Sequence, residues 1–134
     1  MTEPRAHDWD WVDGRAKCSP LVMFGTIKTL AQQNVTKRNQ QKGKEMYQLF
    51  EHDGITFAVN RTDGIGGGAE DRVQFKVSDD LKTIEVSVGR QGRPTVYSVG
   101  LDVNGGCALR SGSAEFQPWQ LLRTHLEALL FLGE

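Results

Sequence analysis

The sequence predicts an α+β domain in which helices cover one face of a curved antiparallel sheet. Three observations carry this prediction. Apolar residues recur at helical spacing early in the chain, the spacing then switches to two for about six short segments, and an apolar helical segment follows. The 134 residues are enough for one domain with its own core. We expect an N-terminal arm over residues 1–17 and a single α+β domain over residues 18–134.

Composition argues against several classes of protein. The net charge of −1 provides no field that would draw the chain to nucleic acid or to an anionic membrane. No apolar run approaches the ~20 residues that span a bilayer, and the polar N-terminal stretch is not typical of a secretory signal. The two cysteines, Cys18 and Cys107, lie far apart and form no disulfide framework. We interpret both as reduced thiols of a cytoplasmic protein, and no cofactor is implied.

Residues 1–17 are predicted to form an extended arm. Trp9 and Trp11 fall on the same side of an extended segment, and two large aromatic side chains at this spacing are expected to dock onto the core. The carboxylates around them do not follow the spacing of an EF-hand calcium loop, which needs alternate oxygen ligands and a distant glutamate. We therefore predict no metal site in the arm.

The first helix is predicted to begin at Pro20, with Ser19 as its N-cap. Its apolar stripe predicts an amphipathic helix of about four turns and consists of Leu21, Phe24, Ile27, Ala31 and Val35. The polar segment 36–44 follows, and its basic residues are Lys37, Arg38, Lys42 and Lys44. No aromatic residue is interleaved to stack on a base, so we interpret this segment as a solvated linker and not as a nucleic-acid contact.

After Lys44 apolar and polar residues alternate, which predicts the strands of an antiparallel meander with one buried face. The dipeptide Asp53-Gly54 predicts a two-residue hairpin turn that requires positive φ, and this turn would pair Phe50 with Phe57. About six strands are expected, over residues 45–52, 55–61, 72–78, 83–88, 95–103 and 107–110.

The glycine-rich stretch TDGIGGGAEDR, residues 62–72, raises the question of phosphate binding. A phosphate-binding glycine loop follows a strand and opens a helix, because the N-terminus of that helix holds the anion. The segment after this stretch has the periodicity of a strand, and Glu70 and Asp71 would repel an anion. We therefore predict a mobile connection between two strands.

The last helix is predicted to begin at Pro118, with an apolar surface wider than one contact requires. Its inner stripe is Trp119, Leu122, Leu126, Leu129 and Leu130. The surplus apolar residues form a candidate interface, which comprises Leu121, Ala128, Phe131 and Leu132. A monomer that exposed them would carry an apolar patch near the upper limit for a soluble monomer. A two-fold homodimer is the commonest way to cover such a patch, and the first helix with the Trp9–Trp11 arm is the alternative cover.

The sequence gives little reason to expect catalysis. The three histidines, His7, His52 and His125, do not have the spacing of a metal site. Cys107 could meet His125 as a thiolate–imidazole pair, but we expect this cysteine to be a small core residue. No nucleophile motif is present.

Two hypotheses about function follow. The first is a non-enzymatic interaction domain that forms a homodimer, or binds a protein partner, through the last helix or the arm. The second is a domain that binds or transforms a small apolar ligand in a pocket between the sheet and the last helix, lined by Phe57, Phe75, Tyr97, Trp119 and Leu126. Nucleic-acid binding ranks last, because the chain as a whole is not basic. A filled space under the last helix favours the first hypothesis, and a cavity of roughly 300 Å³ or more favours the second.

Overall fold

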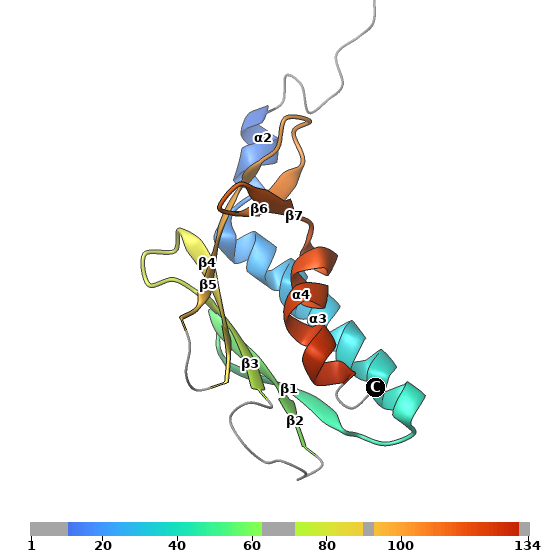
Figure 1. The fold of residues 1–134 in the computed structure, drawn as a ribbon. Coiled ribbons are helices and arrows are strands. Elements are labelled where there is room, and N and C mark those ends of the chain that lie inside the picture. The colour runs from blue at the N-terminus through green and yellow to red at the C-terminus, as the bar shows by residue number, and fades with distance from the viewer. Residues whose placement is uncertain (1–10, 63–71, 90–92, 132–134) are drawn as a thin grey trace, which may run out of the picture.

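A computed structural model describes residues 11–62, 72–89 and 93–131 and has the predicted α+β architecture (Figure 1). Within these residues the helices are α2 (Trp11–Ala16), α3 (Pro20–Lys42) and α4 (Pro118–Leu130). The strands are β1 (Tyr47–Asp53), β2 (Thr56–Arg61), β3 (Arg72–Val77), β4 (Thr83–Val88), β5 (Thr95–Leu101), β6 (Cys107–Ser111) and β7 (Ala114–Phe116). They form one seven-stranded sheet in the order β1 to β7, which confirms the predicted meander. The sequence analysis missed β7, which is three residues long.

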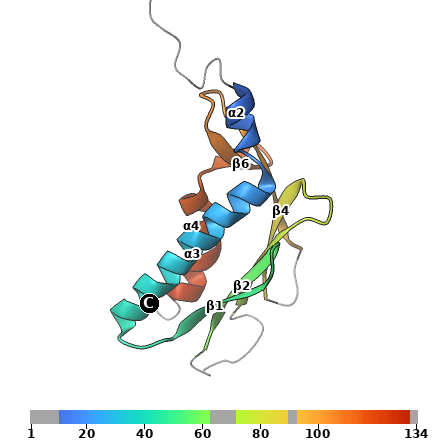
Figure 2. The same cartoon turned by 180° about the vertical axis from the view of Figure 1, so that it is seen from behind.

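The part of the predicted arm that the structure describes is helical and not extended. Trp11 begins the short helix α2, which lies at the opposite end of the molecule from the last turn of α4 (Figure 2). The Trp11 side chain is 60% exposed, so the expectation that it docks onto the core is wrong. Trp9 lies outside the described residues.

Helix α3 begins as predicted and ends later than predicted. The Ser19 hydroxyl oxygen accepts a hydrogen bond from the backbone N–H of Val22 at 3.1 Å, and Pro20 occupies the first turn. The helix then continues to Lys42, for 23 residues, so the basic segment interpreted as a linker is largely helical. Lys, Arg and Gln are strong helix formers, which explains the continuation. Gly43 ends the helix in the left-handed conformation, with φ of 72°.

The hairpin between β1 and β2 is confirmed, but its register differs from the prediction, and the expected positive φ at Gly54 is wrong. Asp53 pairs with Thr56 around the turn, and an irregularity follows between Glu51 and Asp53. Phe50 therefore pairs with Ala58 and not with Phe57. A shift of one residue moves a side chain to the other face of a sheet, and Phe50 is accordingly 41% exposed.

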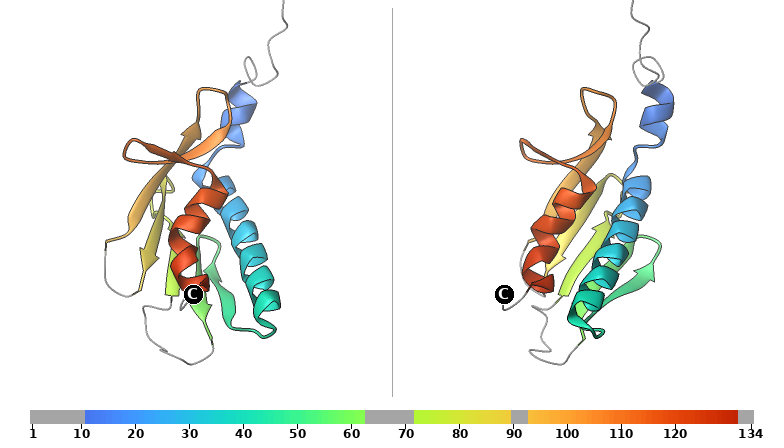
Figure 3. Two further views of the ribbon diagram at one scale, coloured as in Figure 1. Left: turned by 45° about the vertical axis from the view of Figure 1, so that its right-hand side comes forward. Right: turned by 90° about the vertical axis from the view of Figure 1, so that its right-hand side faces the viewer.

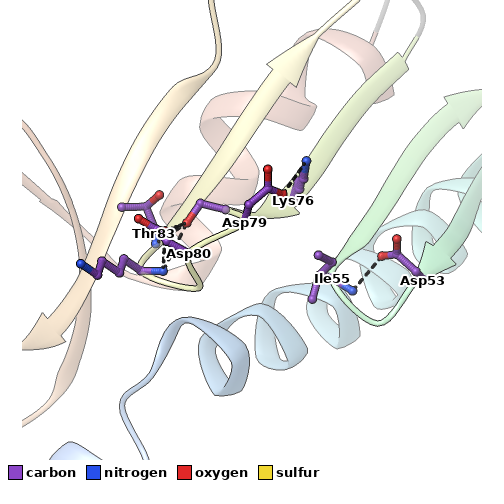
Figure 4. Close-up of polar contacts among 8 residues, drawn as sticks. Asp53, Ile55, Lys76, Asp79, Asp80 and Thr83 are labelled. Carbon is purple, nitrogen blue, oxygen red and sulfur yellow. Dashed lines mark hydrogen bonds and ion pairs between the residues drawn. The ribbon is translucent and has the colours of Figure 1, made fainter.

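The turn between β3 and β4 is held by its own side chains (Figure 4). The Ser78 hydroxyl donates to Asp80 Oδ1 at 2.6 Å and accepts a hydrogen bond from the backbone N–H of Thr83 at 3.0 Å. The hydrogen bond from Ser78 is the main reason why the pKa of Asp80 lies below its ordinary value of 3.8. The turn fixes the register that pairs Val77 with Ile84, so that both point toward the core.

Helices α3 and α4 lie side by side on the same face of the sheet (Figure 3). The ring of Phe24 in α3 contacts Phe57 with 5.2 Å between the ring centroids. Phe57 stacks in turn on Phe75 at 4.7 Å. The buried stripe of α4 consists of Leu121, Leu122, Leu126, Leu129 and Leu130. These side chains belong to one continuous core between the sheet and the two helices.

A disulfide joins Cys18 to Cys107, which corrects the expectation of reduced thiols. The two sulfur atoms are 2.10 Å apart, and the Cα atoms are 5.2 Å apart. Cys18 stands immediately before the N-cap of α3, and Cys107 begins β6. The sequence could not reveal this pairing, because the 89-residue separation says nothing about distance until the meander brings β6 back to the start of α3.

Reduction of this disulfide should lower the stability of the protein. A crosslink that closes a loop of 89 residues restricts the unfolded chain, and such a crosslink stabilises the folded state by about 2–4 kcal/mol. Urea unfolding of the oxidised protein, of the reduced protein and of a Cys18→Ser/Cys107→Ser variant measures this difference. The reduced protein and the double variant should agree with each other, and equal midpoints for all three would contradict the expectation.

The structure also predicts different costs for adding a methyl group at two turn glycines. An added Cβ would meet nothing within 4 Å at Gly43 or at Gly54, but only Gly43 has a positive φ. Gly43→Ala should therefore lower the free energy of unfolding by about 1 kcal/mol, whereas Gly54→Ala should change it by less than about 0.5 kcal/mol. Denaturant midpoints of the two variants test this. A larger loss of stability for Gly54→Ala than for Gly43→Ala would indicate that Gly54 has the positive φ expected from the sequence.

Candidate functional site

Core side chains fill the space in which the sequence predicted a pocket. Phe57, Phe75, Tyr97 and Leu126 are each at most 1% exposed, and the first two stack on each other. The fifth predicted lining residue, Trp119, is 58% exposed and does not face this space. Four of the five residues are therefore brought together, as packed core between the sheet and the helices and not around a cavity in that space.

A groove lies instead on the outer side, between α3 and α4, with a volume of about 460 Å³. We call it the α3–α4 groove. The buried leucines Leu122, Leu126 and Leu130 belong to its lining. Trp119 of α4 and Phe131, which directly follows α4, add aromatic surface, and polar or charged side chains come from both helices. An apolar surface with polar groups placed along it is typical of a binding site.

Arg38 closes one end of the α3–α4 groove. Its Nε donates to the carbonyl oxygen of Leu130 at 2.7 Å, and its Nη1 donates to Gln41 Oε1 at 3.0 Å. Its guanidinium carbon lies 3.9 Å from the centroid of the Phe131 ring, a cation–π contact. The sequence analysis placed Arg38 in a solvated linker. The signal that it overlooked was the unbroken helix propensity of segment 36–42.

The candidate interface is only partly at the surface. Leu121 is fully buried, so its assignment to an interface is wrong, because it is part of the stripe that faces the sheet. Ala128 is exposed and Phe131 is 46% exposed. Leu132 lies outside the described residues. Trp119, which was predicted to face inward, is the largest exposed apolar side chain of α4 and takes the place of Leu121.

Tyr97 of β5 and His125 of α4 form a polar pair between the sheet and the helix. The Tyr97 hydroxyl lies 2.6 Å from His125 Nε2, and the two rings meet edge to face. Burial lowers the pKa of His125 below its ordinary value of 6.5 and raises the pKa of Tyr97. A neutral imidazole can accept the proton of the tyrosine hydroxyl at Nε2. The thiolate–imidazole pair of Cys107 and His125 does not form, because Cys107 is oxidised.

The other candidate residues lie apart from the α3–α4 groove in the described part of the chain. His52 lies by the outer face of the sheet, where Arg72 Nη2 contacts its Nε2 at 3.0 Å. Residues 11–62, 72–89 and 93–131 contain no group of three or more metal-ligating side chains. None of the helices in these ranges has both the length and the apolar character needed to cross a bilayer. The glycine-rich stretch lies mostly outside the described residues, but it joins β2 to β3, as predicted.

Comparison with models of known protein families found no match, and searches among curated proteins and among solved structures found no match either. The interpretation of the site therefore rests on its geometry. In the α3–α4 groove the charged groups are three cations, Lys37, Arg38 and Arg123, and one carboxylate, Glu127. Arg123 Nε holds that carboxylate at 3.2 Å. The groove lining therefore offers apolar surface and these charged groups as contacts for binding.

The Tyr97–His125 pair predicts how stability depends on pH. Because the pKa of His125 is lowered in the folded state, the unfolded chain binds a proton more readily below about pH 6.5. The free energy of unfolding should therefore be unaffected by this residue above that pH and should fall as the pH is lowered through it. Melting temperatures between about pH 7 and pH 5 test this. His125→Gln cannot titrate, so its profile should be flatter, and a profile as steep as that of the wild type would assign the effect to another group.

Proposed function

We propose that this protein is a non-enzymatic binding domain that self-associates through the groove side of α4. One observation carries the proposal. Trp119 and Phe131 are 58% and 46% exposed at the start and just past the end of α4, along a groove whose floor is made of buried leucines. Large aromatic side chains left exposed beside an apolar floor are the usual mark of a protein interface.

The packing of the core supports this proposal over a pocket beneath α4. Phe57, Phe75 and Tyr97, which would line such a pocket, are inaccessible, and the first two stack on each other. The apolar surface that remains on α4 therefore faces outward. A second copy of the chain is the simplest partner for this surface, because one patch can then serve both subunits.

A second candidate function is the binding of a small amphiphilic molecule in the α3–α4 groove. The volume of about 460 Å³ is within the range of ligand sites. Lys37 and Arg38 line one wall, so the favoured ligand would have an apolar body and a carboxylate. Such a ligand would occupy the surface that a second copy needs. Its binding would therefore shift a dimer toward monomers, whereas self-association predicts a dimer in the absence of any ligand.

A cytoplasmic location remains a proposal, and the disulfide weighs against it. The expectation was based on reduced cysteines, whereas Cys18 and Cys107 are joined. Cytosolic thiols are normally kept reduced. The oxidation state of these two cysteines in the cell, measured by alkylation of intact protein, would separate a cytosolic location from an oxidising compartment.

Sedimentation over the micromolar range tests the proposed self-association. The wild type should form a dimer, and Trp119→Ala should raise the dimer dissociation constant about thirty-fold, because a tryptophan buried in a partner's groove commonly contributes about 2 kcal/mol or more. Trp11→Ala is the matched control, since Trp11 is similarly exposed (60% against 58%) but lies on α2. A wild type that remains monomeric throughout would overturn the proposal, and equal effects of both variants would move the interface away from α4.

A further inference from the structure

We infer that two copies meet with their α4 helices antiparallel, about a two-fold axis level with His125. In this arrangement each copy inserts its Trp119 into the end of the other copy's α3–α4 groove, beside Arg38 and Phe131. The inference rests on the proposed self-association and adds the geometry of the partner and the residue that the partner contributes.

The order of residues along α4 gives the first argument. Trp119, Arg123, Glu127 and Phe131 follow one another at intervals of four residues and all line the groove. Residues four apart lie on one side of a helix, and Phe131, the C-cap residue, directly follows the last helical residue, Leu130. The row is symmetric about position 125, with an aromatic residue at each end and a charge on each side of the centre. An antiparallel copy therefore places Trp119 against the partner's Phe131, and Arg123 against the partner's Glu127.

Charge gives the second argument. Within one chain Arg123 Nε and Glu127 Oε2 are 3.2 Å apart, and both side chains are exposed. An antiparallel copy brings each arginine next to the partner's Glu127, so that four charges alternate in sign. A parallel copy would instead set arginine against arginine and glutamate against glutamate, and like charges in contact disfavour an interface.

The end of the groove supplies the place for the tryptophan. Arg38 is held over the Phe131 ring by its hydrogen bond to Leu130, and Lys37 lines the same wall. Arg38 itself is only 8% exposed, whereas Phe131 is 46% exposed. An indole that enters here therefore packs on the exposed part of the Phe131 ring, a favourable aromatic contact, with the charge of the fixed guanidinium group nearby. Tryptophan and arginine are also the residues most often found at the energetic centre of interfaces.

The start of the edge strand β1 is a less suitable surface for a second copy. The side chain of Asn39 already occupies the first positions of the edge strand β1. Its Oδ1 accepts hydrogen bonds from the backbone N–H groups of Met46 and Tyr47, and its Nδ2 donates to the Tyr47 carbonyl at 2.9 Å. This side chain therefore takes the place of a neighbouring strand there, and edges covered in this way resist pairing with another chain.

Complementary charge reversals test the geometry. Arg123→Glu makes the row acidic and Glu127→Arg makes it basic, so each variant alone should form a homodimer at least about tenfold more weakly than the wild type. In a mixture each contact again joins opposite charges, and the two variants should form a heterodimer within about threefold of the wild-type dissociation constant. Native mass spectrometry separates the three dimers, provided that one variant carries a mass label.

Two controls keep the outcomes distinct. Both reversals break the same pair within α4, so the recovery of a heterodimer cannot come from helix stability, and circular dichroism confirms that each variant is folded. Lys28→Glu breaks the Lys28–Glu51 ion pair of 2.7 Å, away from the groove lining, and should leave the dimer unchanged. A monomeric wild type overturns both the proposed function and this inference. A dimer that the single reversals do not weaken, or that the mixture does not restore, overturns only the antiparallel arrangement.

Discussion

The carbonyl oxygen of Leu130 is the point on which the arrangement of the two long helices depends. It accepts a hydrogen bond from Arg38 Nε at 2.7 Å and another from the Tyr47 hydroxyl at 3.0 Å. The last turn of a helix leaves carbonyl groups without partners inside the helix, and here donors from α3 and β1 satisfy one of them. The consecutive elements α3 and β1 are thereby joined at one atom to the end of α4, which is distant in sequence. The α3–α4 groove owes its closed end to this contact, because the same arginine covers Phe131.

The sequence predicted the features that local periodicity determines. It did not predict features that depend on a one-residue shift in strand register or on a contact between distant segments. Alternation identified six strands in the correct order, and the Ser19 cap located the start of α3. The irregularity beside Asp53 places Phe50 on the solvent-exposed face of the sheet. The pattern of apolar residues does not predict such an irregularity. The disulfide and the contacts of Arg38 depend on how the meander returns to the helices, so they are properties of the fold and not of any local segment.

The same limit explains the exchange of roles between Trp119 and Leu121. Successive residues of a helix are rotated by about 100°, so both can lie near the border of a wide apolar stripe. Leu121 turned out to face the sheet and Trp119 to face the groove. A branched aliphatic side chain fits a close-packed interior more readily than an indole, whose N–H requires a partner when it is buried. The candidate surface was therefore predicted on the correct helix but with one of its main residues misplaced.

Helix α3, one wall of the groove, is fixed at both of its ends, and this rigidity affects the free-energy cost of binding a partner. The disulfide ties the start of α3 to β6, and Arg38 ties its last turns to the end of α4. A groove between two helices that are fixed in this way needs little ordering when a partner arrives, and a small ordering cost leaves more of the contact energy available as affinity. The interface aromatics differ in this respect: Phe131 is fixed under the guanidinium group of Arg38, whereas Trp119 stands more than half exposed on the first turn of α4. The fixed ring with its cation therefore serves as the receiving surface, and the exposed indole serves as the inserting group. In a two-fold arrangement each copy supplies one receiving ring, Phe131, and one inserting indole, Trp119. The same contact therefore forms twice in the dimer.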